Sequence, residues 1–116
     1  MNIYVGHLKI HKGYYAGRPN SSLGNPASYK PNKFATVICS TKQECLDYYD
    51  SWLQKQLMIK DSKQSVEIDL LIEHLKINQE LTLLCWCVKD KRLFIENPYC
   101  HCDIIAKYIM QSINAI

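Results

Sequence analysis

Short apolar runs separated by turn-forming residues mark the first third of the chain. Residues 3–5 and 14–17 each form a β-prone run, and residues 34–39 (FATVIC) form a third. Each run is typical of a short strand. Between the second and third runs, residues 18–32 are rich in Gly, Pro, Asn and Ser, which favour turns. Because long loops in compact domains are often functional, this loop is a first candidate site.

The first helical periodicity begins at a capping box. In Thr41-x-x-Glu44, the hydroxyl and the carboxylate can satisfy free amides at a helix start. The apolar residues that follow recur at helical spacing. The pattern predicts a helix over residues 42–57.

Two further helices are predicted. Asp61 or Ser62 can cap a helix whose apolar face continues to Ile77, with Asn78 as its C-cap. Near the end of the chain, residues 103–113 place several isoleucines on one face, which predicts the last helix.

The order of the elements indicates an α/β fold. Residues 81–87 (LTLLCWC) are almost continuously apolar, the pattern of a strand covered on both faces. A polar turn leads to a short run at residues 93–95, so we expect the two runs to pair as a hairpin. The order strand, loop, strand, helix, helix, strand, helix predicts one small, three-layer, Rossmann-like domain over residues 1–116. It would have a partly parallel central sheet and about three helices.

The composition is typical of one globular domain, and it disfavours some classes of binding partner. The 116 residues are 47% hydrophobic and 22% charged, ordinary values for a folded domain. The formal charge of +3 comes without a clustered basic stripe, which disfavours duplex DNA or RNA as a partner. The sequence shows neither a signal-peptide pattern nor an apolar run that could span a membrane. We therefore expect a cytoplasmic protein with reduced thiols and no membrane partner, and the sequence leaves a homo-oligomer open.

Cysteine and histidine gather in two motifs, C-W-C at residues 85–87 and C-H-C-D at residues 100–103. The second motif lies where the last helix begins, and a helix N-terminus lowers the pKa of a thiol and attracts anions. Four cysteine or histidine side chains from the two motifs could bind zinc in a tetrahedral site, although structural zinc sites usually use C-x-x-C pairs. The alternative is that the cysteines are small core residues and that Asp103 is an N-cap. We assign no metal ligand and no cofactor from the sequence.

The long loop carries the second candidate motif. Arg18, next to Gly17, offers a planar guanidinium group to phosphate or carboxylate. Gly24 and Asn25 would let the backbone approach a ligand closely. The alternative is an ordered turn with a surface arginine, because Gly and Pro are turn residues first of all.

The motifs resemble a known family when they are taken in order. GRPNSSLGNP, a helix containing DYYDSWL, then LLCWC and PYCHCDIIA follow one another as in the bacterial and viral family named domain of unknown function 4326. By similarity, the family positions are Gly17, Arg18, Pro19, Gly24, Asn25, Pro26, Tyr49, Trp52, Cys85, Trp86, Cys87, Cys100, His101 and Asp103. The chain departs from the pattern in two places. Residues 88–99 separate motifs that the family brings close together, and Cys102 stands where the family residue is commonly small.

The resemblance implies a ligand class but no activity. The Rossmann-like appearance of the family and its presence in phages suggest recognition of a nucleotide or nucleotide-derived ligand. Our first hypothesis is a phage-encoded protein that binds or sequesters such a small molecule, a role consistent with anti-defence. Its ligand-binding residues would be Gly17, Arg18, Gly24, Asn25 and Cys87.

Two alternatives remain open. An enzyme acting on a nucleotide or a glycosidic bond would use Cys100 as nucleophile, or His101 with Asp103 as acid and base. A zinc-stabilised protein would instead bind a host macromolecule. The first hypothesis requires that two distant segments, around residues 18–25 and 100–103, form one polar hollow.

Overall fold

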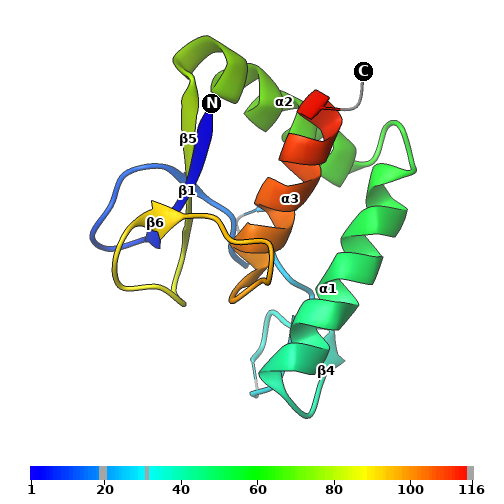
Figure 1. The fold of residues 1–116 in the computed structure, drawn as a ribbon. Coiled ribbons are helices and arrows are strands. Elements are labelled where there is room, and N and C mark those ends of the chain that lie inside the picture. Colours follow the sequence, from blue (N-terminus) through cyan, green and yellow to red (C-terminus); the bar gives the residue numbers. More distant parts are fainter. Residues whose placement is uncertain (19–20, 31, 115–116) are drawn as a thin grey trace.

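The structure, a computed structural model, describes residues 1–18, 21–30 and 32–114. It has an α/β fold with three helices and a mixed, mostly parallel sheet, as the order of apolar runs predicted (Figure 1). The strands are Asn2–His7 (β1), Tyr14–Tyr15 (β2), Ala27–Ser28 (β3), Val37–Ile38 (β4), Glu80–Cys85 (β5) and Arg92–Leu93 (β6). The helices are Lys42–Leu57 (α1), Lys63–Asn78 (α2) and His101–Asn114 (α3).

The main sheet has the strand order β2-β5-β1-β6. β5 runs parallel to both of its neighbours, β1 and β2, whereas β6 pairs antiparallel with β1. β3 and β4 form a separate, parallel pair. The carboxyl ends of β1, β2 and β5 therefore meet at one edge of the main sheet, the place where open α/β sheets usually bind ligands.

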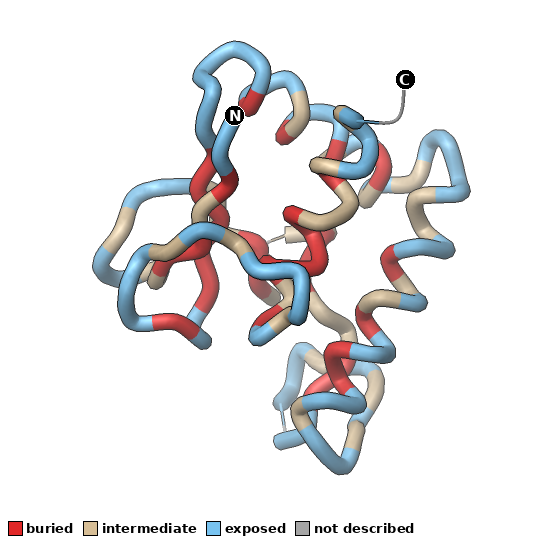
Figure 2. The backbone as a smooth tube through the Cα atoms, in the orientation of Figure 1, coloured by how far each residue is buried: buried red, intermediate tan, exposed pale blue. Residues whose placement is uncertain are grey.

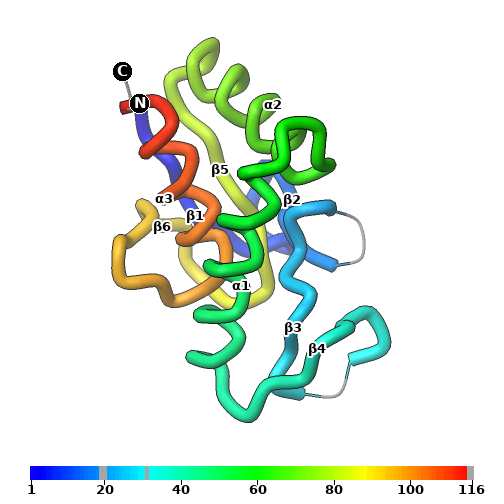
Figure 3. The backbone as a smooth tube through the Cα atoms, turned by 90° about the vertical axis from the view of Figure 1, so that its right-hand side faces the viewer, coloured from blue at the N-terminus to red at the C-terminus, as the bar shows by residue number. Residues whose placement is uncertain are grey.

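The helices lie on one side of the main sheet (Figures 1 and 3). α2 and α3 pack against the sheet, and α1 packs on α2 and α3. Helices therefore cover one face of the sheet, whereas the sequence prediction placed the sheet at the centre of three layers. Residues 81–85 are nevertheless all buried, so both faces of β5 are covered, as their continuous apolar pattern predicted.

One hydrophobic core joins the layers. Ile3 and Val5 of β1, Leu83 of β5, Leu75 of α2 and Ile105 of α3 are all fully buried within it. Figure 2 shows buried positions along most of β5 but only at intervals along α1, as expected for a helix with one apolar face. Among the described residues, no helix combines the length and the apolar composition that crossing a membrane requires.

Local capping signals placed two helices correctly. Thr41 caps α1 by accepting a hydrogen bond from the Glu44 amide, and the Glu44 carboxylate accepts one from the Ser40 amide. Ser62, one of the two predicted caps, accepts from the Ser65 amide at the start of α2. At the end of α2 the C-cap is Gln79 and not Asn78, because residue 79 adopts the left-handed conformation with φ of 64°.

Strand pairing differs from the sequence prediction in two places. The run at residues 81–87 does not form a hairpin with the run that follows it, because β6 pairs with β1 on the far side of β1 from β5. The run at residues 34–39 forms only the short β4, whose Ile38 is largely exposed. In the first case the outcome depends on a partner strand that is distant in sequence, since β1 and β6 lie at opposite ends of the chain.

Candidate functional site

A pocket of about 360 Å³ brings the two predicted motifs together at the carboxyl edge of the main sheet. Arg18 and His101, which are far apart in sequence, both line it. We call its two walls the loop side and the strand–helix side. The loop side consists of Gly17, Arg18, Asn25, Ala27, Ser28, Tyr29, Asn32 and Phe34. The strand–helix side consists of Cys85, Trp86, Cys87, Cys100 and His101, and the lining is completed by Tyr15, Lys42, Cys45 and Leu46.

Arg18 organises the loop side. Its Nη1 donates hydrogen bonds to the carbonyl oxygens of Asn25, at 2.8 Å, and Ala27, at 2.9 Å. The Asn25 side chain is also engaged, because its Nδ2 donates to the Cys45 carbonyl and its Oδ1 accepts from the Ala27 amide. A guanidinium group carries five donors in all, so Arg18 keeps donors beyond those used by Nη1. Arg18 can therefore both shape the loop and contact an anion in the pocket.

Gly17 and Gly24, the two glycines predicted to bind a ligand, lie where neighbouring atoms leave little room for a side chain. A Cβ atom on Gly24 would lie 3.0 Å from the Arg18 amide nitrogen, so this buried position allows two parts of the loop to touch, although it does not line the pocket. A Cβ atom on Gly17 would lie 2.3 Å from the Tyr15 ring. That ring bridges the two sides, since its hydroxyl accepts a hydrogen bond from Trp86 Nε1 and donates one to the Arg18 carbonyl. Pro19, a family position, lies outside the described residues.

Cations and exposed aromatic rings dominate the chemistry of the lining. Arg18 and Lys42 contribute positive charge, and no carboxylate occurs among the described residues that line the pocket. Trp86, Phe34 and Tyr29 are 55%, 46% and 45% exposed, which is unusual for large apolar side chains grouped at one hollow. Of these residues, Arg18 and Trp86 belong to motifs recognised in the sequence, whereas Lys42, Phe34 and Tyr29 do not. No local pattern marks Lys42, which appears in the sequence only as the first residue of a helix.

His101 is held in the pocket wall as a neutral imidazole. Its Nε2 donates a hydrogen bond to the Ala16 carbonyl at 2.6 Å, and its ring packs edge-on against Tyr49. Because a carbonyl oxygen can only accept, this contact places the proton on Nε2 and leaves Nδ1 as an acceptor. Burial lowers the pKa of His101, and the hydrogen bond to Ala16 only partly opposes that effect.

Asp103 has a structural environment and does not line the pocket. Its carboxylate is fully buried and forms two hydrogen bonds with the guanidinium group of Arg92, at 2.8 and 2.9 Å. It also accepts hydrogen bonds from the amides of Ile95, Tyr99 and Cys100. Burial alone would raise the pKa of Asp103, but Arg92 and the three amides outweigh burial and lower it. Within the described part of the chain, no hydrogen bond joins Asp103 to His101, so the predicted acid–base pair is not brought together.

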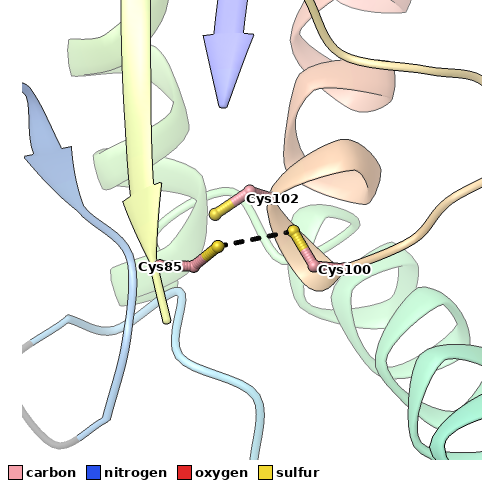
Figure 4. Close-up of side chains that lie close together, drawn as sticks. All are labelled: Cys85, Cys100 and Cys102. Atoms are coloured by element: carbon pink, nitrogen blue, oxygen red, sulfur yellow. Dashed lines mark hydrogen bonds between the residues drawn. The ribbon is translucent and has the colours of Figure 1, made fainter. Parts of the chain in front are cut away.

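The cysteines of the two motifs converge. Cys85 Sγ lies 3.6 Å from Cys100 Sγ, and the Sγ atoms of Cys85, Cys100 and Cys102 all lie within 4.8 Å of one another (Figure 4). Hydrogen bonds from its thiol neighbours lower the pKa of Cys85. Interactions with Cys100 and Cys85, together with burial, raise the pKa of Cys87. Interactions with Cys102 and Cys85, together with burial, raise the pKa of Cys100. The convergence of the two cysteine motifs agrees with the hypothesis from the sequence, and the structure shows that Cys102 takes part in it.

The comparisons with known proteins agree with the motifs. No curated protein and no solved structure matches the chain. One family does match, and it covers residues 4–111, nearly the whole chain. Those residues include both sides of the pocket. The chain therefore belongs to the family described as Domain of unknown function (DUF4326).

Proposed function

We propose that the protein binds a nucleotide-derived small molecule in the pocket between the loop side and the strand–helix side. The observation that carries the proposal is the combination of Arg18 and Lys42 with exposed aromatic rings in one hollow. Cations bind phosphate, and aromatic faces stack on bases. The volume of about 360 Å³ falls within the range of small-molecule sites.

The position of the pocket supports the same ligand class. It lies beyond the carboxyl ends of parallel strands, where β5 ends at Cys85 and α3 begins at His101. The free amides and partial positive charge of a helix N-terminus favour an anionic group. His101 lines the pocket, and Nδ1 is the ring nitrogen that its hydrogen bond to Ala16 leaves as an acceptor.

The geometry favours binding over the catalytic alternative. Asp103 lies outside the pocket lining, and its carboxylate is bound to Arg92 and to three backbone amides, so it is not placed to act with His101. Turnover by Cys100 or His101 stays a prediction, which chromatography of nucleotides incubated with the protein would test. The sequestering, phage-encoded role implied by the resemblance also stays a prediction.

Calorimetric titration with nucleosides and their mono- and diphosphates tests the proposal. We expect the phosphorylated ligands to bind at least roughly tenfold more tightly than the nucleosides, since a charge-assisted hydrogen bond contributes about 1.5 kcal/mol or more. Lys42→Gln should weaken phosphate-dependent binding by roughly three- to tenfold. Lys55→Gln makes the same charge change near the far end of α1 and should have no effect. Absence of binding, or equal effects of the two variants, would overturn the proposal.

A further inference from the structure

Three buried thiols form a cluster at the junction of β5 and α3. Cys85 is the last residue of β5, whereas Cys100 and Cys102 lie just before and within the first turn of α3. Their exposed fractions are 1%, 1% and 0%. In Figure 4 the three sulfur atoms point toward one another from the strand and the helix. A single buried cysteine is ordinary, but three that converge from two elements form a set of soft ligands.

The spacing of the sulfur atoms matches a metal site. A tetrahedral Zn²⁺ ion with Zn–S bonds of about 2.3 Å holds its sulfur ligands roughly 3.8 Å apart. Cys85 Sγ and Cys100 Sγ are 3.6 Å apart, and each lies within 4.8 Å of Cys102 Sγ. Small side-chain rotations would therefore bring all three into coordination distance of one ion.

The fourth ligand lies on the pocket side of the cluster. Cys87 follows Cys85 by two residues and lines the pocket together with Cys85 and Cys100. Cys87 is exposed, so it can adjust toward an ion without disturbing the core. The two C-x-C motifs thus each supply two ligands, one motif from the end of a strand and the other from the start of a helix.

The surroundings would stabilise a site that carries negative charge. α3 begins at His101, between Cys100 and Cys102, and the partial positive charge of a helix N-terminus stabilises thiolates. Asp103 accepts a hydrogen bond from the Cys100 amide and so fixes the backbone that presents the Cys100 thiol. Such outer contacts orient metal ligands.

We propose that the three clustered cysteines and Cys87 bind one Zn²⁺ ion in a tetrathiolate site. The ion would tie the end of β5 to the start of α3 and so fix the strand–helix side of the pocket. This site does not depend on the nucleotide ligand proposed above, and it can be tested without any nucleotide.

Cobalt is the direct probe. Metal-free protein, kept reduced with a phosphine, is titrated with Co²⁺. The expected result is one Co²⁺ per chain, with the intense visible absorption of tetrahedral thiolate coordination and its loss when Zn²⁺ is added. Only the weak absorption of octahedral, hydrated Co²⁺ would overturn the proposal.

Two serine variants locate the ligand set. Cys87→Ser removes an exposed ligand, so the variant should fold, shift the Co²⁺ spectrum and bind Co²⁺ at least roughly tenfold more weakly. Cys39→Ser is the matched control, because Cys39 lies outside the cluster, and its spectrum and affinity should equal those of the wild type. A Cys87→Ser variant indistinguishable from the wild type would overturn the tetrathiolate assignment.

Alkylation of the unmodified protein avoids any question of folding. Zn²⁺ should slow the modification of Cys85, Cys87, Cys100 and Cys102, mapped by peptide mass spectrometry, and should leave Cys39 unaffected. Equal rates with and without Zn²⁺ would contradict the proposal.

Discussion

The two sides of the pocket are built in opposite ways. The loop side has little regular structure, and hydrogen bonds from side chains such as Arg18 and Asn25 to nearby backbone hold it together. The strand–helix side joins a buried strand to a helix, and the fully buried carboxylate of Asp103 braces it. The exposed rings of Phe34 and Tyr29 lie on the loop side. The difference teaches that buried, stabilising contacts are concentrated on the strand–helix side, whereas the loop side presents exposed rings that remain available for the ligand we propose.

Asp103→Asn should produce the largest effect, on the strand–helix side. The variant breaks the paired contact with Arg92 and weakens the bonds from three amides. Losing one partner of a buried ion pair costs about 3–5 kcal/mol. Chemical denaturation should therefore show a fall of that size in the free energy of unfolding. Glu73→Gln, which breaks an exposed pair with Lys76, should change it by less than about 1 kcal/mol.

The same variant should change the response to acid. The pKa of Asp103 is lower in the folded state than in the unfolded state, where it is about 3.9. Its stabilisation is therefore complete above the unfolded-state pKa and is lost as the pH falls through the folded-state pKa. Asp103→Asn should lack this component of acid unfolding. If Asp103→Asn left the free energy of unfolding unchanged at neutral pH, the strand–helix side would not be the more stabilising side of the pocket.

Arg18→Lys should have an intermediate effect that falls on binding more than on stability. Lysine keeps the charge but lacks the planar guanidinium group, whose Nη1 donates to two carbonyl oxygens and whose other donors would contact the proposed anion. We expect roughly tenfold weaker binding of nucleoside phosphates by calorimetry, with a loss of about 1 kcal/mol in unfolding free energy. A loss of stability as large as that of Asp103→Asn would show that the loop side is equally important for folding.

His101 should give the smallest effect, seen as a pH slope. Its folded-state pKa is lowered by burial, so below about pH 6.5 the unfolded chain takes up a proton that the folded chain does not. Stability should therefore decrease as the pH falls from that value toward the folded-state pKa. His101→Gln keeps a donor for the Ala16 carbonyl and should flatten this slope, whereas His74→Gln, at an exposed position, should retain it. Denaturation curves between pH 5 and 8 provide the measurement.

The sequence by itself determined the helices and the two motifs of the pocket. α1 spans residues 42–57 as predicted, because the hydrogen bonds of the Thr41 and Glu44 cap join residues no more than four apart. The α/β class followed from the order of the runs, and family membership followed from rare residues in a fixed order. Such signals depend on near neighbours or on the order of motifs along the chain, so they can be recognised without knowledge of the tertiary structure.

Only the tertiary structure decided how those parts meet. In the folded protein β6 pairs with β1 and not with β5, and the Asp103 carboxylate accepts hydrogen bonds from Arg92. The tertiary structure also places Lys42 in the pocket and Cys102 beside Cys85. The physical reason is that strand pairing, burial and side-chain convergence depend on contacts between distant segments, and each such contact becomes favourable only when the others have formed.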